Sequence, residues 1–138
     1  MDLLTAQTAI LAQLRTMNEA RTVETFAGDI EELFRDTSPK PGLHLLYAGT
    51  AYGEQETLGA PVQPVPTRQV WTVLIAVSGR KSAAATDGAA LELIAAVQDA
   101  LAGYKIGNDH VWPEAVEFLK SKNGVLIYGA DFHLDTED

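Results

Sequence analysis

Residues 79–82, Gly-Arg-Lys-Ser, stand between an apolar segment and a helix-like segment, in the order of parts found in phosphate-binding loops. Such a loop places a glycine five residues before a directly adjacent Gly-Lys pair, so that successive backbone N–H groups wrap the phosphates. Here Leu74 holds the early position, and Arg80 separates Gly79 from Lys81. The segment lacks the backbone freedom that the loop needs, and we interpret it as a solvated basic turn.

The histidines are the next candidates for chemistry. His44, His110 and His133 lie far apart in the sequence, and none has a partner at the spacing of a helical metal pair. We expect them to be solvent-facing or hydrogen-bonded. Cysteine is absent, which excludes thiolate ligands and thiol nucleophiles, and no serine lies in a Gly-x-Ser-x-Gly elbow. We therefore predict no catalytic, cofactor-binding or metal-ligating residues, and expect a protein that is not an enzyme.

Composition and charge limit the partners. The 138 residues are 46% hydrophobic and 21% charged, which is typical of a soluble globular chain, and the length predicts a single domain over residues 1–138. The formal charge of -9 opposes binding to DNA and to anionic lipid. The N-terminal segment lacks the layout of a signal peptide, and no apolar run is long enough for a membrane span. We expect neither sequence-specific nucleic acid binding nor a membrane partner.

Hydrophobic periodicity predicts most elements. An apolar stripe predicts a helix over about residues 3–19, and a short extended piece around Val23 and Phe26 precedes a brief helix that Asp29 would cap. Residues 43–52 and 70–78 read as strands, the second covered on both faces and therefore internal. Thr86 or Asp87 would cap a helix that ends near Leu101, before Gly103.

The remaining segments are a loop and a C-terminal pair. Residues 53–67 are rich in proline and glycine and predict a long exposed loop. Residues 113–122 fit a helix or a strand, and we prefer a strand with Val116 and Phe118 facing inward, because Asn123-Gly124 favours a hairpin turn. A half-exposed closing strand follows over 125–138, with Leu126, Tyr128, Ala130, Phe132 and Leu134 on one face. The fold class is α+β, with an antiparallel or mixed sheet of four to five strands flanked by helices.

In order along the chain, these segments resemble the small tail proteins of Mu-like phages and prophages that are identified as tail terminators or tail completion proteins. The resemblance rests on "RTVETFAGDIEELF", "LHLLYAG", "RQVWTVLIAVSGRKSAAATDGAALELIAAVQDALAGYKIG" and "VLIYGADFHLDTED". It implies an α/β unit that forms a ring, typically hexameric, on the end of a tail tube. The ring would stop tube growth and present a surface to the head or neck.

The resemblance also implies partners and places. The partners would be copies of the chain itself, the tail tube protein and head–tail connector or neck proteins, with DNA passing through the ring. The protein would assemble in the host cytoplasm and reside in the virion tail. Interaction residues are expected on the long loop and the basic positions, namely Glu54, Glu56, Pro61, Pro64, Arg68, Arg80 and Lys81.

Charge adds a physical condition on such a ring. Six copies would carry -54, six times the -9 of one chain, so acids at subunit contacts would oppose closure unless Arg and Lys pair with them. We hypothesise that Arg68, Arg80 and Lys81 bridge to acids of neighbouring subunits. Other acids would line the bore, where repulsion lets DNA slide.

Two alternatives remain open from the sequence. One is a different adaptor at the head–tail joint or baseplate. The other is a small-molecule-binding or enzymatic α/β domain, with His44 or His133 as the polar group of a pocket between sheet and helices.

Overall fold

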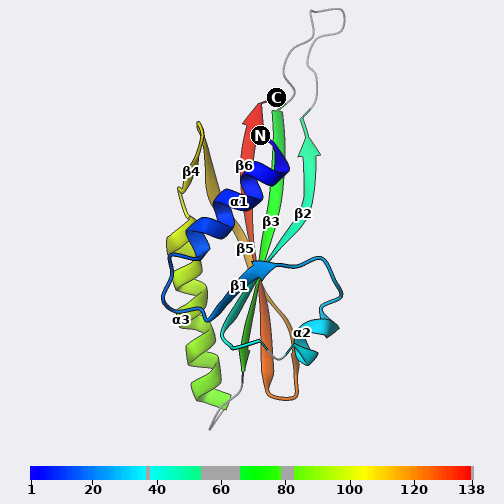
Figure 1. The fold of residues 1–138 in the computed structure, drawn as a ribbon, viewed down its shortest axis with the longest axis vertical. Helices are drawn as coiled ribbons and strands as arrows, with labels where there is room; N and C mark the ends of the chain where they lie inside the picture. The colour runs from blue at the N-terminus through cyan, green and yellow to red at the C-terminus, as the bar shows by residue number, and fades with distance from the viewer. Residues whose placement is uncertain (37, 54–65, 79–82, 138) are drawn as a thin grey trace, which may run out of the picture.

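The computed structural model describes residues 1–36, 38–53, 66–78 and 83–137. Within these ranges, six strands form one sheet and three helices lie on it (Figure 1). The helices are α1 (Leu3–Leu14), α2 (Glu31–Arg35) and α3 (Ala83–Leu101). The strands are β1 (Thr22–Thr25), β2 (Gly42–Tyr52), β3 (Pro66–Ser78), β4 (Lys105–Ile106), β5 (Asp109–Lys122) and β6 (Val125–Glu137).

The sheet has the order β1-β2-β3-β6-β5-β4. Its β1–β2 pair is parallel and its other pairs are antiparallel, so the predicted α+β class with a mixed sheet is confirmed. The predicted count of four to five strands is too low for the described residues because of β4. That strand has only two residues, and a two-residue segment shows no periodicity.

The core lies mainly between one face of the sheet and the helices α1 and α3 (Figure 1). Val73 and Ile75 on β3 face this layer, together with Ala130, Phe132 and Leu134 on β6. Because side chains alternate along a strand, Leu74, Ala76 and Ile127 lie on the opposite face. There they pack with Leu33 of α2. Both faces of the central strand β3 are therefore buried, as its sequence predicts.

Helix α1 is shorter than predicted. The Asp2 carboxylate caps its start by accepting from the Leu4 N–H at 3.3 Å. The predicted end near residue 19 is wrong, because the helix ends at Leu14. The Thr16 amide donates to the Gln13 carbonyl and the Met17 amide to the Leu14 carbonyl. The Thr16 hydroxyl also donates to the Gln13 carbonyl, at 2.7 Å. This tight turn ends the helix while Met17 still packs on the core.

The other predicted helices differ at their starts. Asp29 accepts from the Glu31 N–H at 3.1 Å, but the N-cap residue of the brief helix α2 is Ile30, so the predicted cap is wrong by one residue. Helix α3 begins at Ala83, so the prediction that Thr86 or Asp87 caps it is wrong. Three consecutive alanines, the strongest helix formers, extend this helix towards its N-terminus.

The C-terminal hairpin confirms the preferred reading of residues 113–122. These residues belong to β5, which pairs with β6 down to Lys122↔Val125. Asn123 and Gly124 connect the strands with φ values of 51° and 77°, the left-handed conformation that a tight hairpin turn requires at both central positions. Glycine meets this requirement without steric cost.

Gly124→Ala is expected to lower the free energy of unfolding by about 1–2 kcal/mol, because an L side chain strains a positive φ. Gly88 is the matched control. It lies inside α3 with no heavy atom within 4 Å of an added Cβ, so Gly88→Ala is expected to stabilise by about 0.5–1 kcal/mol. Urea unfolding of both variants checks the opposite signs. Two changes of the same sign would contradict this account of the turn.

The predicted loop 53–67 is only partly within the described residues. Pro66 and Thr67 belong to β3, where they pair with Glu137 and Thr136, so the loop prediction is wrong for them. The Gly53 amide donates to the Pro66 carbonyl at 2.7 Å. Residues 54–65 lie outside the described residues. None of the described helices is long and apolar enough to cross a bilayer.

Candidate protein interface

Strand β5 has a free edge over most of its length. On one side it pairs with β6 from Val111 to Lys122. On the other side, β4 reaches only His110 and Asp109, and the chain around Gly103 and Tyr104 bonds only to Val111. Among the described residues, no strand pairs with this side of 113–122. An open edge of this kind presents unpaired backbone donors and acceptors to another chain.

Large apolar side chains stand on this same strand. Trp112 is 49% exposed and Phe118 is 52% exposed, and Val116 and Leu119 are also exposed. We call Trp112, Val116, Phe118 and Leu119 the β5 surface. The prediction that Val116 and Phe118 face inward is wrong. They pair with Ala130 and Tyr128 and so lie on the sheet face that α1 and α3 cover elsewhere. Here the helices do not cover them, and they are not part of the core cluster.

The β5 surface extends around both faces of the strand. The Phe118 ring meets the Tyr128 ring edge-on, with centroids 5.4 Å apart. Leu119 sits at a β-bulge and lies across Gly129, where an added Cβ would stand 3.1 Å from Leu119 Cδ1. Large exposed apolar side chains along a free strand edge suit a protein interaction site. The geometry therefore identifies this edge as a candidate interface.

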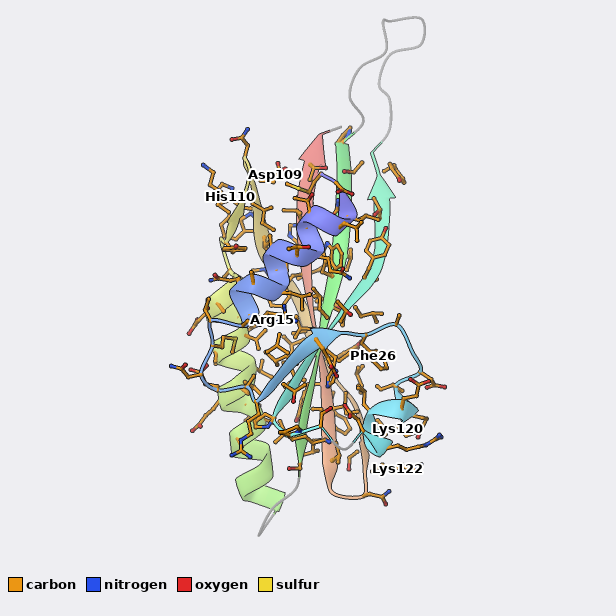
Figure 2. All side chains as sticks on the ribbon, viewed as in Figure 1. Arg15, Phe26, Asp109, His110, Lys120 and Lys122 are labelled. Carbon is orange, nitrogen blue, oxygen red and sulfur yellow. The ribbon has the colours of Figure 1, made fainter. Side chains whose placement is uncertain are left out.

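Two lysines fix the end of the strand against α2. Lys120 and Lys122 lie beside α2 (Figure 2). Their ammonium groups both pair with the Glu31 carboxylate, Lys122 at 3.2 Å. These pairs hold the pKa of Glu31 below its ordinary value, Lys120 contributing most. Lysines, bulges and Pro113 are devices by which edge strands avoid indiscriminate pairing. The β5 edge can thus pair with a partner of complementary shape, while these features disfavour non-specific strand pairing.

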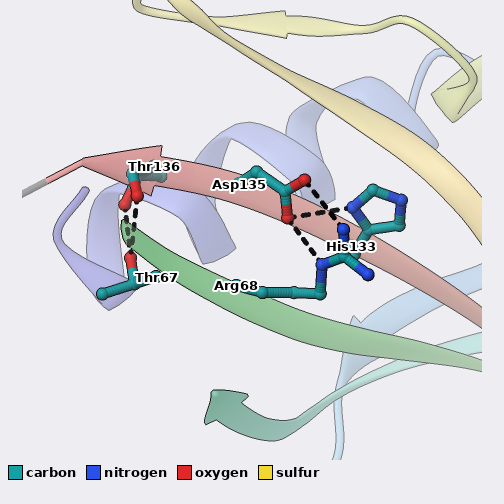
Figure 3. Close-up of polar contacts among 5 residues, drawn as sticks. All are labelled: Thr67, Arg68, His133, Asp135 and Thr136. Atoms are coloured by element: carbon teal, nitrogen blue, oxygen red, sulfur yellow. Dashed lines mark hydrogen bonds and ion pairs between the residues drawn. The ribbon is translucent and has the colours of Figure 1, made fainter. Parts of the chain in front are cut away.

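A polar network lies at the other end of β3 and β6 (Figure 3). The Arg68 guanidinium donates to both carboxylate oxygens of Asp135, Nε to Oδ1 at 2.8 Å and Nη2 to Oδ2 at 3.1 Å. His133 Nδ1 lies 3.1 Å from the same Oδ1. The hydrogen bonds from Arg68 lower the pKa of Asp135, and His133 lowers it further. Partial burial of the carboxylate opposes this effect but does not cancel it. Next to it, the hydroxyls of Thr67 and Thr136 share a hydrogen bond of 2.6 Å.

The network predicts a pH-dependent contribution to stability. Because the folded-state pKa of Asp135 is depressed, its contribution is present above the unfolded value near 3.8 and is lost as the pH falls through the lowered folded value. The Tm of the parent chain should exceed that of Asp135→Asn at pH 7, and the gap should close in strong acid. Thermal scans across this range check it, and 1 M salt should shrink the gap, because both side chains are half exposed. A gap that persists in strong acid would contradict it.

The network borders an open hollow of about 780 Å³. It is lined by the ends of β2, β3 and β6 and the turn before β5, through Ala51, Tyr52, Gly53, Pro66, Thr67, Arg68, Asn108, Asp109, Asp135 and Thr136. His133 is hydrogen-bonded to Asp135 and is not among the lining residues. The small-molecule alternative needs a pocket that His133 lines, and this hollow is not such a pocket.

Of the seven residues expected to make interactions, the structure describes one. Arg68 is within the described chain, where it pairs with Asp135 of its own β6. The residues Glu54, Glu56, Pro61, Pro64, Arg80 and Lys81 lie outside the described residues. The sequence analysis does not predict the β5 surface. Of its four residues, Val116 and Phe118 are expected to face inward, and Trp112 and Leu119 receive no role, although their large apolar side chains are the signal that could have found it.

His44 also departs from its expectation. It is only 3% exposed, and its Nδ1 finds no hydrogen-bond partner among the described residues, so the prediction of a solvent-facing or hydrogen-bonded ring is wrong here. Burial lowers the pKa of His44, and the carboxylates of Glu24 and Asp36 oppose part of this effect. His110 is exposed and stacks on Trp112 at 6.2 Å between ring centroids.

Comparison with known proteins bears on the whole chain. A model of the phage tail terminator protein family matches residues 1–137. The chain belongs to this family. No curated protein matches the sequence. This tail terminator is similar in fold to a chain from the virion of a native gene transfer agent particle, with 17% identity, a TM-score of 0.60 and coverage of 99% of this chain and 100% of that one.

A second solved structure agrees with this tail terminator at 12% identity and a TM-score of 0.58, covering 100% of this chain and 96% of the other. At such identities these likenesses concern the fold alone. The functional class follows from the family assignment: the chain is a structural tail protein. The β5 surface is then a candidate contact between virion components.

Proposed function

We propose that this tail terminator closes the end of a tail tube as a homohexameric ring, ends tube polymerisation and forms the surface to which the head or neck attaches. It acts by binding and catalyses no reaction. Its partners are its own copies, the tail tube protein and the connector or neck proteins. The chain acts as a single domain, assembles in the host cytoplasm and serves a Mu-like phage or prophage. The match of the terminator family over residues 1–137 carries this proposal.

The β5 surface fits a contact with a second copy. A closed ring needs head-to-tail contacts between two different patches of each subunit. The sheet offers a second free edge on β2, where β1 pairs only with residues 42–45 and the Phe26 amide adds one bond to Leu45. Beyond it, Tyr47 and Tyr52 are exposed, Tyr52 by 73%. Among the described residues, the sheet thus has one free apolar edge at each side.

Strand direction agrees with such a contact. Three successive antiparallel pairings separate β2 from β5, so the two strands run in opposite directions. A neighbour rotated about an axis along the strands would then present its β2 antiparallel to β5. Backbone hydrogen bonds would join the edges, and the aromatic side chains would be covered. Arg68 already pairs with Asp135 of its own chain, so a bridge from Arg68 to a neighbouring acid would share its guanidinium with Asp135.

Electron microscopy of tails made with and without this gene tests the function. Particles with the gene are expected to have tails of uniform length that end in a ring. Particles without it are expected to have tubes of variable length and no attached heads. Uniform tails in the absence of the gene would sink the proposal.

Cross-linking tests the proposed edges. The chain has no cysteine, so cysteines placed at the exposed positions Ala48 on β2 and Glu114 on β5 are the chain's only thiols. The registers put these two positions at about the same height in the sheet. On assembled tails, a short bismaleimide should convert the Ala48→Cys, Glu114→Cys double variant into a ladder of multimers that stops at the ring size. Each single variant should stay monomeric. A dimer from Glu114→Cys alone would instead show β5 pairing with β5 about a two-fold axis.

A further inference from the structure

The β1 edge of the sheet brings together three potential metal ligands. Glu24 of β1 and His44 of β2 are direct neighbours in the parallel register. Asp36 follows α2 and turns back towards the same place. One ligand atom from each of these three residues lies within 4.8 Å of the other two. The sequence hides this set, because its members are 8 to 20 residues apart and belong to three segments.

The imidazole of His44 is the distinctive member of this set. Its ring is buried, and within the described part of the chain its Nδ1 has no hydrogen-bond partner, although it faces the Glu24 carboxylate. A buried polar atom without a partner is costly. The Phe26 ring packs against the imidazole at 6.0 Å between centroids, and Gly42 leaves room for Nε2, which an added Cβ would approach to 3.0 Å. The ring is therefore held with Nδ1 aimed at the two acids.

The spacing suits a small cation better than a hydrogen bond. His44 Nδ1 and Glu24 Oε1 are 3.5 Å apart, which is long for an N–H···O bond. Two ligands on a tetrahedral Zn²⁺, each bonded at about 2.0–2.1 Å, are separated by about 3.4 Å. An ion between Nδ1 and Oε1 would satisfy both atoms without moving either strand.

Asp36 is oriented in the way that metal-binding carboxylates are. Its Oδ1 accepts from the Ser38 backbone N–H at 2.9 Å and from the Ser38 hydroxyl at 2.7 Å. These two donors fix the carboxylate plane, and no described residue donates to Oδ2. Outer hydrogen bonds of this kind hold a ligand in place before the ion arrives.

The charged side chains around Glu24, Asp36 and His44 carry a net negative charge, which favours a cation there. A pocket of about 330 Å³ lies over the set, and Glu32 and Arg35 help to line it. The Lys40 ammonium lies near as well, donating to the Asp36 carbonyl at 2.9 Å. Three carboxylates face two cationic side chains, so the net charge around a neutral imidazole is -1. Lys40 is the group that opposes a bound cation most directly.

From this geometry we propose that Glu24, Asp36 and His44 bind a divalent cation of the zinc class. One imidazole nitrogen and two carboxylates suit Zn²⁺, which accepts both nitrogen and oxygen ligands in a compact tetrahedral site. Water would fill the fourth position. The ion would tie β1 and the segment after α2 to β2, and so stabilise the edge of the sheet. This site is separate from the β5 surface, and its failure would leave the ring proposal untouched.

The test is calorimetric titration of the purified, metal-free full-length chain with ZnCl₂, together with its Tm at saturating Zn²⁺. The parent chain is expected to bind one Zn²⁺ per chain and to gain thermal stability by linkage. His44→Gln and Glu24→Gln should each weaken binding at least about 100-fold, since even the loss of an outer hydrogen bond to a ligand costs about 10–100-fold. Mg²⁺ in excess should not compete.

Controls separate this site from the acidic surface in general. His110→Gln removes an exposed histidine and should bind Zn²⁺ as the parent does. Glu24 is half exposed, so Glu24→Gln should fold even if His44→Gln does not. Lys40→Gln should tighten binding, because it removes the opposing charge. The proposal is overturned if the parent chain binds no Zn²⁺, or if Glu24→Gln binds it as tightly as His110→Gln.

Discussion

A Phe118→Glu variant is expected to fold like the parent chain and to leave tail tubes uncapped. Phe118 is 52% exposed and stands outside the core, so the free energy of unfolding should change by less than about 1 kcal/mol. In the ring, however, the substitution would bury a carboxylate at a subunit contact. An aromatic residue at the centre of an interface contributes about 2 kcal/mol or more, and the buried charge adds to this loss.

The measurement is the distribution of tail lengths by electron microscopy after complementation with the variant. We expect lengths as broad as those made without the gene, and no terminal ring. Leu91→Glu is the matched control, because Leu91 is equally exposed, at 54%, but belongs to helix α3 and not to either free strand edge. It should give tails of normal length. Normal tails from Phe118→Glu would remove β5 from the interface.

Phe132→Ala is expected to cause the largest loss of stability, about 3–5 kcal/mol, the usual cost of deleting a buried aromatic ring. Phe132 is only 1% exposed, on β6 in the middle of the sheet. It packs in the core cluster that joins the sheet to α1 and α3. Native domains have free energies of unfolding of only about 5–15 kcal/mol, so this variant should be partly unfolded or insoluble at 37 °C.

Urea unfolding at 25 °C gives the change in free energy. Phe118→Ala is the control, since it makes the same chemical change on the neighbouring strand at an exposed position. It should cost less than about 1 kcal/mol. Phe132→Leu keeps a large apolar group and should cost less than Phe132→Ala. Equal losses at the two phenylalanines would contradict the burial that separates them.

Together these variants divide the protein into two parts. The buried face of β3 and β6 holds the fold, and the edge of β5 is available for assembly. Arg68 belongs with the first part in the isolated chain, because its charge is balanced by Asp135 within the same sheet. The apolar edges of β2 and β5 are the contacts that we propose to close the ring, and the bridges expected from Arg68 to neighbouring acids stay a prediction.

Local sequence determined the elements of this protein. The alternation of apolar residues predicts β3 and the hairpin of β5 and β6, and Asn123-Gly124 predicts its turn, because strand period and turn conformation are properties of adjacent residues. The same reading fails where few residues carry the signal. The two-residue strand β4 is missed, and the early end of α1 depends on local bonds from Thr16 and Met17.

The tertiary structure decided which apolar and polar residues are covered. An alternating pattern states that one face of a strand is apolar, but only the positions of α1 and α3 determine that Phe132 is buried and Phe118 is not. Likewise, His44 meets Glu24 and Asp36 only because β1 and β2 are parallel neighbours. Burial and side-chain encounters depend on contacts between segments distant in sequence, which periodicity along the chain does not record.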